Sequence, residues 1–166
     1  IGTFEMPFDI ELVSPEYLES LEEAMRLCAS KVRNLNPALG ELVITHIRDL
    51  LKSQDKVKVD PITVPPVLLT SVLSAHLDDE ASALAGVEAF TFLAGAIDRT
   101  ENGLANFEAC DPIHIILDGA VRHAKSAKVV FTALKALLRI IERSSHLASL
   151  CSEAFIVDGI RLCLVE

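Results

Sequence analysis

Three observations predict that this chain of 166 residues adopts an all-α fold of stacked helices. Hydrophobic residues make up 51% of it but aromatic ones only 5%, and an Ala- and Leu-rich chain without Trp favours closely packed helices over a β-sandwich. Apolar residues recur at helical spacing along most of its length. The segments 81–117 and 128–164 match in size and polarity at an offset of 47 residues, which is typical of an α-solenoid.

Two helix starts are visible in the first part of the chain. Residues 14–16 combine a hydroxyl cap, a proline in the first turn and an acid near the positive end of the helix dipole, and residues 36–37 open a second helix with Asn and Pro. Residues 1–13 show no helical period, so we expect an extended N-terminal arm before a helical domain that spans 14–166. The two helices carry apolar stripes at Leu18, Leu21, Ala24, Met25 and Cys28 and at Leu39, Leu42, Val43, Ile47, Leu50 and Leu51.

The later helices begin at proline, acidic or hydroxyl residues after a polar connector at 54–63. Asp111 before Pro112 and Ser126 before a long apolar period are expected to act as N-caps. The helices are predicted, in chain order, at 64–77, 81–98, 104–109, 112–123, 127–143, 147–154 and 156–165. Gly86, inside one of them, is expected to mark a close contact between two helices.

This order of short, medium and long helices resembles armadillo repeats. Segments 64–69 and 111–116 resemble the proline-led start of the second helix of that repeat, and 129–141 resembles its third helix. The resemblance covers residues 37–166 and implies a short right-handed α-solenoid of about three armadillo-like repeats. Typical repeats have a glycine between the first two helices; here that turn is placed at Asp111 and, one copy later, at Asp158 with Gly159. A non-repeating helical bundle is the alternative.

Charge and composition exclude several classes of function. A net charge of −9 argues against nucleic-acid binding, because neutralisation of phosphates by Lys and Arg supplies most of that affinity. The uncharged run 61–77 contains three prolines and does not look like a membrane span. The N-terminus lacks a secretory leader and begins with Ile, so we expect a cytoplasmic piece of a longer protein. The four scattered cysteines are expected to be free thiols, with disulfide bonding as the alternative.

No constellation of catalytic or metal-ligating residues is visible in the sequence. The five histidines are far apart and do not combine with the cysteines at zinc spacing. Glycine-rich phosphate loops and a G-x-S-x-G elbow are absent, and the acidic run 78–80 is explained as a helix cap. We therefore expect no cofactor, no metal and no enzymatic activity.

Basic residues gather between 122 and 143. The helix predicted at 127–143 has an expected apolar face of Val130, Leu134, Leu137 and Ile141. In a stack of armadillo type the third helices line the concave surface, so the basic residues of this helix would line a binding groove. The alternative is that they form an ordinary solvated helix face. The basic residues are Arg122, Lys125, Lys128, Lys135, Arg139 and Arg143, of which Lys128, Lys135 and Arg139 fall on the face opposite the apolar one, with Thr132 and Glu142. This face carries Ala81, Ala85, Glu88, Phe92 and Gly95 one copy earlier and Glu41 and Thr45 two copies earlier, so the predicted groove has an acidic end, a single aromatic residue and a basic end.

These features predict a protein–protein interaction scaffold that binds a partner peptide or helix on its concave surface. The alternative is a helical self-association module of a larger protein, whose apolar end faces stack on another copy. The predicted partner-binding residues are Glu88, Phe92, Lys128, Lys135 and Arg139.

Overall fold

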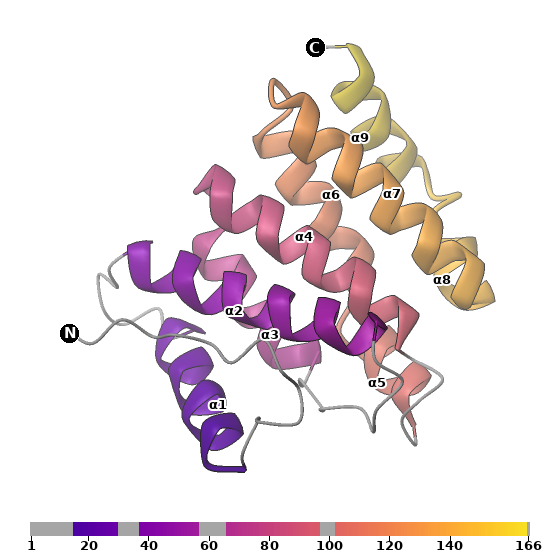
Figure 1. Cartoon of the computed structure of the whole chain (residues 1–166). Coiled ribbons are helices and arrows are strands. Elements are labelled where there is room, and N and C mark those ends of the chain that lie inside the picture. The colour runs from indigo at the N-terminus through magenta and orange to yellow at the C-terminus, as the bar shows by residue number, and fades with distance from the viewer. Residues whose placement is uncertain (1–14, 30–36, 57–65, 97–101, 166) are drawn as a thin grey trace.

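The structure is a computed structural model that describes residues 15–29, 37–56, 66–96 and 102–165 (Figure 1). Within these ranges every regular element is a helix, which confirms the all-α prediction. The predicted arm 1–13 and residues 57–63 of the predicted connector lie outside the described residues, whereas residues 54–56 complete a helix. The elements are α1 (Pro15–Ala29), α2 (Pro37–Lys56), α3 (Pro66–His76), α4 (Glu80–Gly95), α5 (Gly103–Ala109), α6 (Pro112–Arg122), α7 (Ala127–Arg143), α8 (Ser145–Leu150) and α9 (Ala154–Val165).

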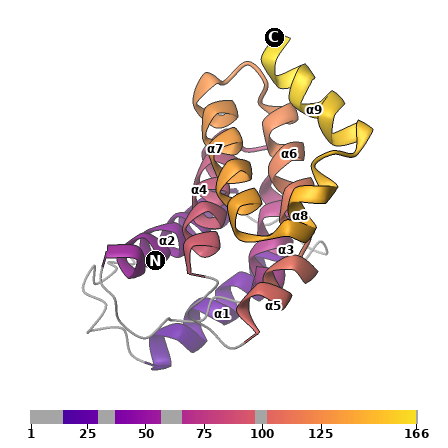
Figure 2. The same cartoon turned by 90° about the vertical axis from the view of Figure 1, so that its right-hand side faces the viewer.

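The helices form two layers (Figures 1 and 2). In one layer α2, α4 and α7 lie side by side, with α4 in contact with both of its neighbours. In the other layer α3 packs against α1 and α6, and α6 packs against α9. The short helices α5 and α8 each follow a long helix of the first layer and connect it to the next helix of the second.

Side-chain caps determine where three of these helices begin. The Asp79 carboxylate accepts a hydrogen bond from the Ser82 amide at 2.9 Å and so caps α4, and the hydroxyls of Ser126 and Ser144 cap α7 and α8. The predicted cap at Asp111 is wrong. Asp111 precedes α6 with a left-handed φ of 52° and makes no capping bond; its carboxylate instead contacts His114 Nδ1 at 2.5 Å.

The core fills the space between the two layers. Phe90 of α4 and Phe107 of α5 are fully buried and meet edge to face with their ring centroids 6.4 Å apart. The expectation for Gly86 is confirmed, because a Cβ at this position would lie 2.5 Å from Cδ1 of Leu73 on α3. A side chain as small as glycine lets α4 approach α3 closely enough to exclude water.

Two of the predicted apolar stripes are rotated relative to the observed buried faces. On α2, Leu39 and Leu42 are 39% and 44% exposed, although the rest of that stripe is buried. On α7, Leu137 is buried as predicted, but Leu134 and Ile141 are only half-buried. The face that α7 buries against α4 and α6 also includes small residues. Alanine contributes little to a hydrophobic pattern, so the predicted stripe did not include it. Its buried residues are Val129, Val130, Ala133, Ala136, Leu137 and Ile140.

The offset of 47 residues relates only part of the fold. Helices α4 and α7 begin at Glu80 and Ala127, which are 47 residues apart, but α6 and α9 begin at Pro112 and Ala154, which are 42 apart. The offset changes because only Ser144 separates α7 from α8, where residues 96–102 separate α4 from α5. Asp158 and Gly159 therefore lie inside α9, and the prediction of a turn there is wrong.

Candidate protein-binding surface

The predicted binding residues on α4 are half-buried. The Glu88 carboxylate lies 3.8 Å from Nη1 of Arg48 on α2, and Arg48 also bonds the Asp49 carboxylate at 3.0 Å. Phe92 packs partly against the core, so its ring is neither fully covered nor free. Ala85, which was predicted on the same outer face, is only 2% exposed and belongs to the core.

The acidic end predicted for the groove contains a basic residue. The predicted face included Glu41 and Glu88 but not Arg48, which the structure brings next to Glu88. The Arg48 guanidinium is shared between Glu88 and Asp49, so this group keeps a net charge of one acid. Glu41 is exposed two turns before Arg48 on α2, so this end of the face remains acidic but contains a paired base.

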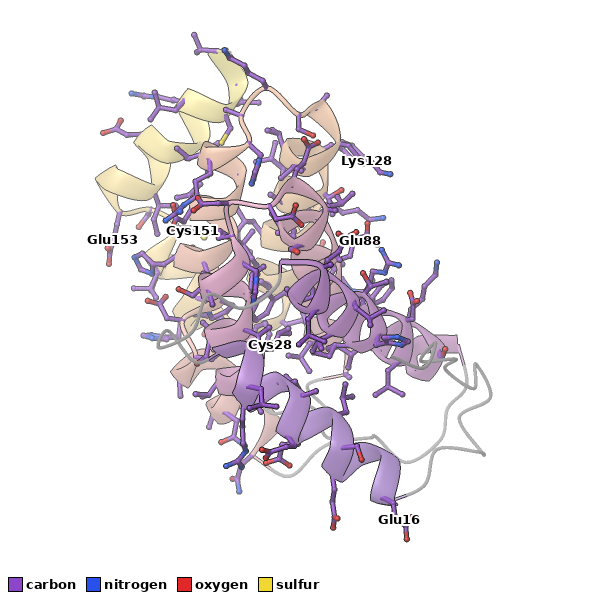
Figure 3. The ribbon with its side chains drawn as sticks, turned by 90° about the vertical axis from the view of Figure 1, so that its left-hand side faces the viewer. Glu16, Cys28, Glu88, Lys128, Cys151 and Glu153 are labelled. Atoms are coloured by element: carbon purple, nitrogen blue, oxygen red, sulfur yellow. The ribbon has the colours of Figure 1, made fainter. Side chains whose placement is uncertain are left out.

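The basic residues predicted on α7 lie on one side of that helix. Lys128 and Lys135 are exposed, and Arg139, one turn beyond Lys135, is half-buried. Figure 3 shows that Glu88 and Lys128 project from the same side of the molecule, the side formed by α2, α4 and α7. The structure thus brings the α4 and α7 members of the predicted site onto one outer face.

Sequence reasoning missed two exposed apolar residues of α7. Phe131 is 70% exposed beside the lysines of this face, and Leu138 is 59% exposed on the side of the helix that points away from α4. Phe131 lies three residues after Lys128 and four before Lys135, which places the ring between the two lysines on the helix surface. The sequence could have revealed them, because both are large apolar residues that do not belong to the predicted apolar stripe of this helix.

Arg122 of the basic group has a structural role. Its guanidinium bonds Asp118 at 3.0 Å and Asp78 at 2.6 Å, and so ties the end of α6 to the turn after α3. Hydrogen bonds to Asp118 first, and then to Asp78, raise the pKa of Arg122. An open hollow of about 500 Å³ lies beside it between the ends of α6 and α7, and its polar groups His123 and Ser126 bond other parts of the fold.

The cysteine thiols are held in their protonated form at neutral pH. Burial raises the pKa of all four, and that of Cys110 reaches about 11. A protonated thiol is a poor nucleophile and a poor metal ligand. Among the residues that the structure describes, no three His, Cys, Asp or Glu side chains gather in a way that could hold a metal ion.

The outer face of α4 and α7 therefore combines an exposed aromatic ring, two exposed lysines and a half-buried acid. None of the described helices is both long and apolar enough to cross a membrane. Comparison of the chain with protein-family models, with curated proteins and with solved structures finds no match.

Proposed function

We propose that this protein is an interaction scaffold that binds a peptide or helix of a partner protein on the outer face of α4 and α7. The observation that carries the proposal is Phe131, whose ring is 70% exposed between Lys128 and Lys135. Exposed aromatic area has no role in folding, and aromatic anchors supply much of the binding energy of protein interfaces.

The chemistry of the face defines the class of partner. An apolar side chain of the partner would cover the Phe131 ring, and carboxylates beside it would meet Lys128 and Lys135. Arg139 extends the basic side by one turn, while Glu88 and Phe92 form the neighbouring part of the face on α4. The partner segment is therefore an acidic one with at least one large apolar residue.

The proposed architecture is a short right-handed α-solenoid of about three armadillo-like repeats, acting in the cytoplasm. The layer α2–α4–α7 supports it, because these three helices lie side by side, as the third helices of such repeats would. The helices α4 and α7, which begin 47 residues apart, support it further. In this architecture the outer face of the layer is the concave surface that holds an extended segment.

Selection from a random peptide library tests the proposal. Selected peptides should share acidic residues around an apolar one, and Phe131→Ala should weaken their binding about tenfold or more without lowering the melting temperature. Val67→Ala is the matched control, because Val67 is 57% exposed on α3 in the other layer. Peptides that bind Phe131→Ala as well as the parent protein would contradict the proposal.

The charges of the face are tested separately. Lys135→Glu combined with Arg139→Glu should slow association with an acidic peptide and flatten its dependence on salt, because charges at the rim of an interface act mainly on the association rate. An unchanged association rate would show that the basic side of α7 does not meet the partner.

A further inference from the structure

One side of α4 is covered by α7. The Ser126 hydroxyl at the start of α7 donates a hydrogen bond to the Glu80 carboxylate at 2.6 Å, so α7 lies on the side of α4 that carries Glu80. Val87, Thr91 and Ala94 follow Glu80 by 7, 11 and 14 residues, which places them on the same side of the helix. All three are buried, with exposed fractions of 0%, 7% and 0%.

The corresponding side of α7 is not covered by any helix that the structure describes. Leu134, Leu138 and Ile141 lie 7, 11 and 14 residues after Ala127, as the buried residues of α4 do after Glu80. Leu138 is 59% exposed where its counterpart Thr91 is 7% exposed, and the other two are half-buried. We call this side of α7 the C-terminal edge.

The opposite end of the stack also has exposed apolar side chains. Arg48 marks the side of α2 that faces α4, and Leu39, nine residues earlier, lies half a turn away on the far side. Leu39 and Leu42 are 39% and 44% exposed there, and Leu27 of α1 is 48% exposed. We call these three residues the N-terminal edge.

The helices at the two ends carry opposite charge. Helix α1 has the acids Glu16, Glu19, Glu22 and Glu23 against one base, Arg26. Helix α7 has the bases Lys128, Lys135, Arg139 and Arg143 against one acid, Glu142. Helices α2 and α9, the other helices at the two ends, carry equal numbers of acids and bases, so the N-terminal end is acidic and the C-terminal end is basic as a whole. Opposite net charge of the two ends favours their encounter and disfavours pairing of like ends.

We propose that this chain associates with a second copy of itself head to tail, the C-terminal edge of one copy packing against the N-terminal edge of the next. In this arrangement Leu138 and its neighbours are covered by α2 of the second copy, much as Val87, Thr91 and Ala94 are covered by α7. A contact between two different surfaces leaves one edge of each kind open, so association continues into oligomers of growing length. This self-association uses the ends of the stack and goes beyond the proposed binding of a partner on its outer face.

Two edge variants test the head-to-tail geometry by sedimentation velocity at increasing protein concentration. The parent protein should show a sedimentation coefficient that rises with concentration. Leu138→Glu at the C-terminal edge and Leu42→Glu at the N-terminal edge should each remain monomeric, because each lacks one of the two surfaces. Mixed together, the two variants should form a 1:1 dimer that grows no further, since one intact edge of each kind remains.

Val67→Glu, at an exposed position of α3, is the control and should associate like the parent protein. Thermal melts of all variants check that the folds are intact, which is expected because the three side chains are exposed. A monomeric Leu138→Glu together with a normally associating Leu42→Glu would show that the C-terminal edges pair with each other and would overturn the proposal. A parent protein that stays monomeric at every concentration would also overturn it, whereas peptide binding to the outer face could persist.

Discussion

The ring of His123 donates a hydrogen bond from Nε2 to the backbone carbonyl of Leu77 at 2.8 Å, and so joins the end of α6 to the end of α3. His76, 47 residues earlier, makes the same kind of bond from Nε2 to the carbonyl of Cys28 at 3.2 Å, which joins the end of α3 to the end of α1. The carbonyls at helix ends lack partners within the helix, so each histidine satisfies one of them. The repeated contact supports the proposal that α1, α3 and α6 are equivalent members of a stack.

The first prediction concerns these two histidines. His76→Ala should lower the free energy of unfolding by about 1–3 kcal/mol, because it leaves a buried carbonyl without its partner. His123→Ala should cost less, since His123 is half-buried where His76 is only 8% exposed. Urea unfolding measures both, and His146→Ala, at an exposed position of α8, is the control. Equal effects at His76 and His146 would contradict a structural role for the repeated contact.

The second prediction uses two neighbouring leucines of α7. Leu137 is 4% exposed and Leu138 is 59% exposed. Leu137→Ala should destabilise the fold by about 2–5 kcal/mol, as truncation of a core side chain does. Leu138→Ala should cost less than about 0.5 kcal/mol in dilute protein, as surface substitutions do. Denaturant unfolding compares the two, and a large loss in Leu138→Ala would mean that the C-terminal edge is covered within the monomer.

The third prediction concerns the close contact at Gly86. Alanine is favoured over glycine by about 1 kcal/mol inside a helix, so Gly86→Ala would stabilise an isolated α4. In the folded protein the new methyl group meets Cδ1 of Leu73, which is fully buried and has little room to move. We expect a net loss of about 1–3 kcal/mol, the usual cost of overpacking. A rise in melting temperature would show that the two helices can separate at low cost.

A fourth prediction follows from the raised thiol pKa values. Burial raises the pKa of Cys110 from its ordinary value of 9.0 to about 11, so the folded protein keeps this proton to higher pH than the unfolded chain does. The stability from the protonated thiol is complete below pH 9 and is lost as the pH rises towards 11. The melting temperature should fall across this window, and Cys110→Ala should make the fall shallower.

The same thiols should react in the order of their exposure. Cys151 is half-buried, whereas the other three cysteines are buried. Alkylation of the native protein near neutral pH should therefore modify Cys151 first, as peptide mass spectrometry would show. Early modification of Cys110 would contradict both its burial and its raised pKa.

Local signals in the sequence were sufficient to locate the helices. Proline at positions 15, 37 and 112 stands at the first residue of a helix, because its fixed φ suits that position and its missing N–H is not needed there. The Ser126 hydroxyl accepts a hydrogen bond from a backbone amide in the first turn of α7 and so caps the helix. The predicted bounds of this helix, 127–143, are the observed ones. These features depend only on residues close together along the chain, so they can be recognised without knowledge of the tertiary structure.

The tertiary structure alone decided how far the buried side of each helix extends and which side chains of different helices meet. The hydrophobic period of α7 indicated an apolar stripe, but the contacts with α4 and α6 place Ile140 in the core and Phe131 and Leu138 at the surface. Arg48 meets Glu88 only because α2 packs beside α4. A helical period reports the spacing of apolar side chains, whereas the buried side depends on how many neighbours the helix has and how closely small residues let them approach.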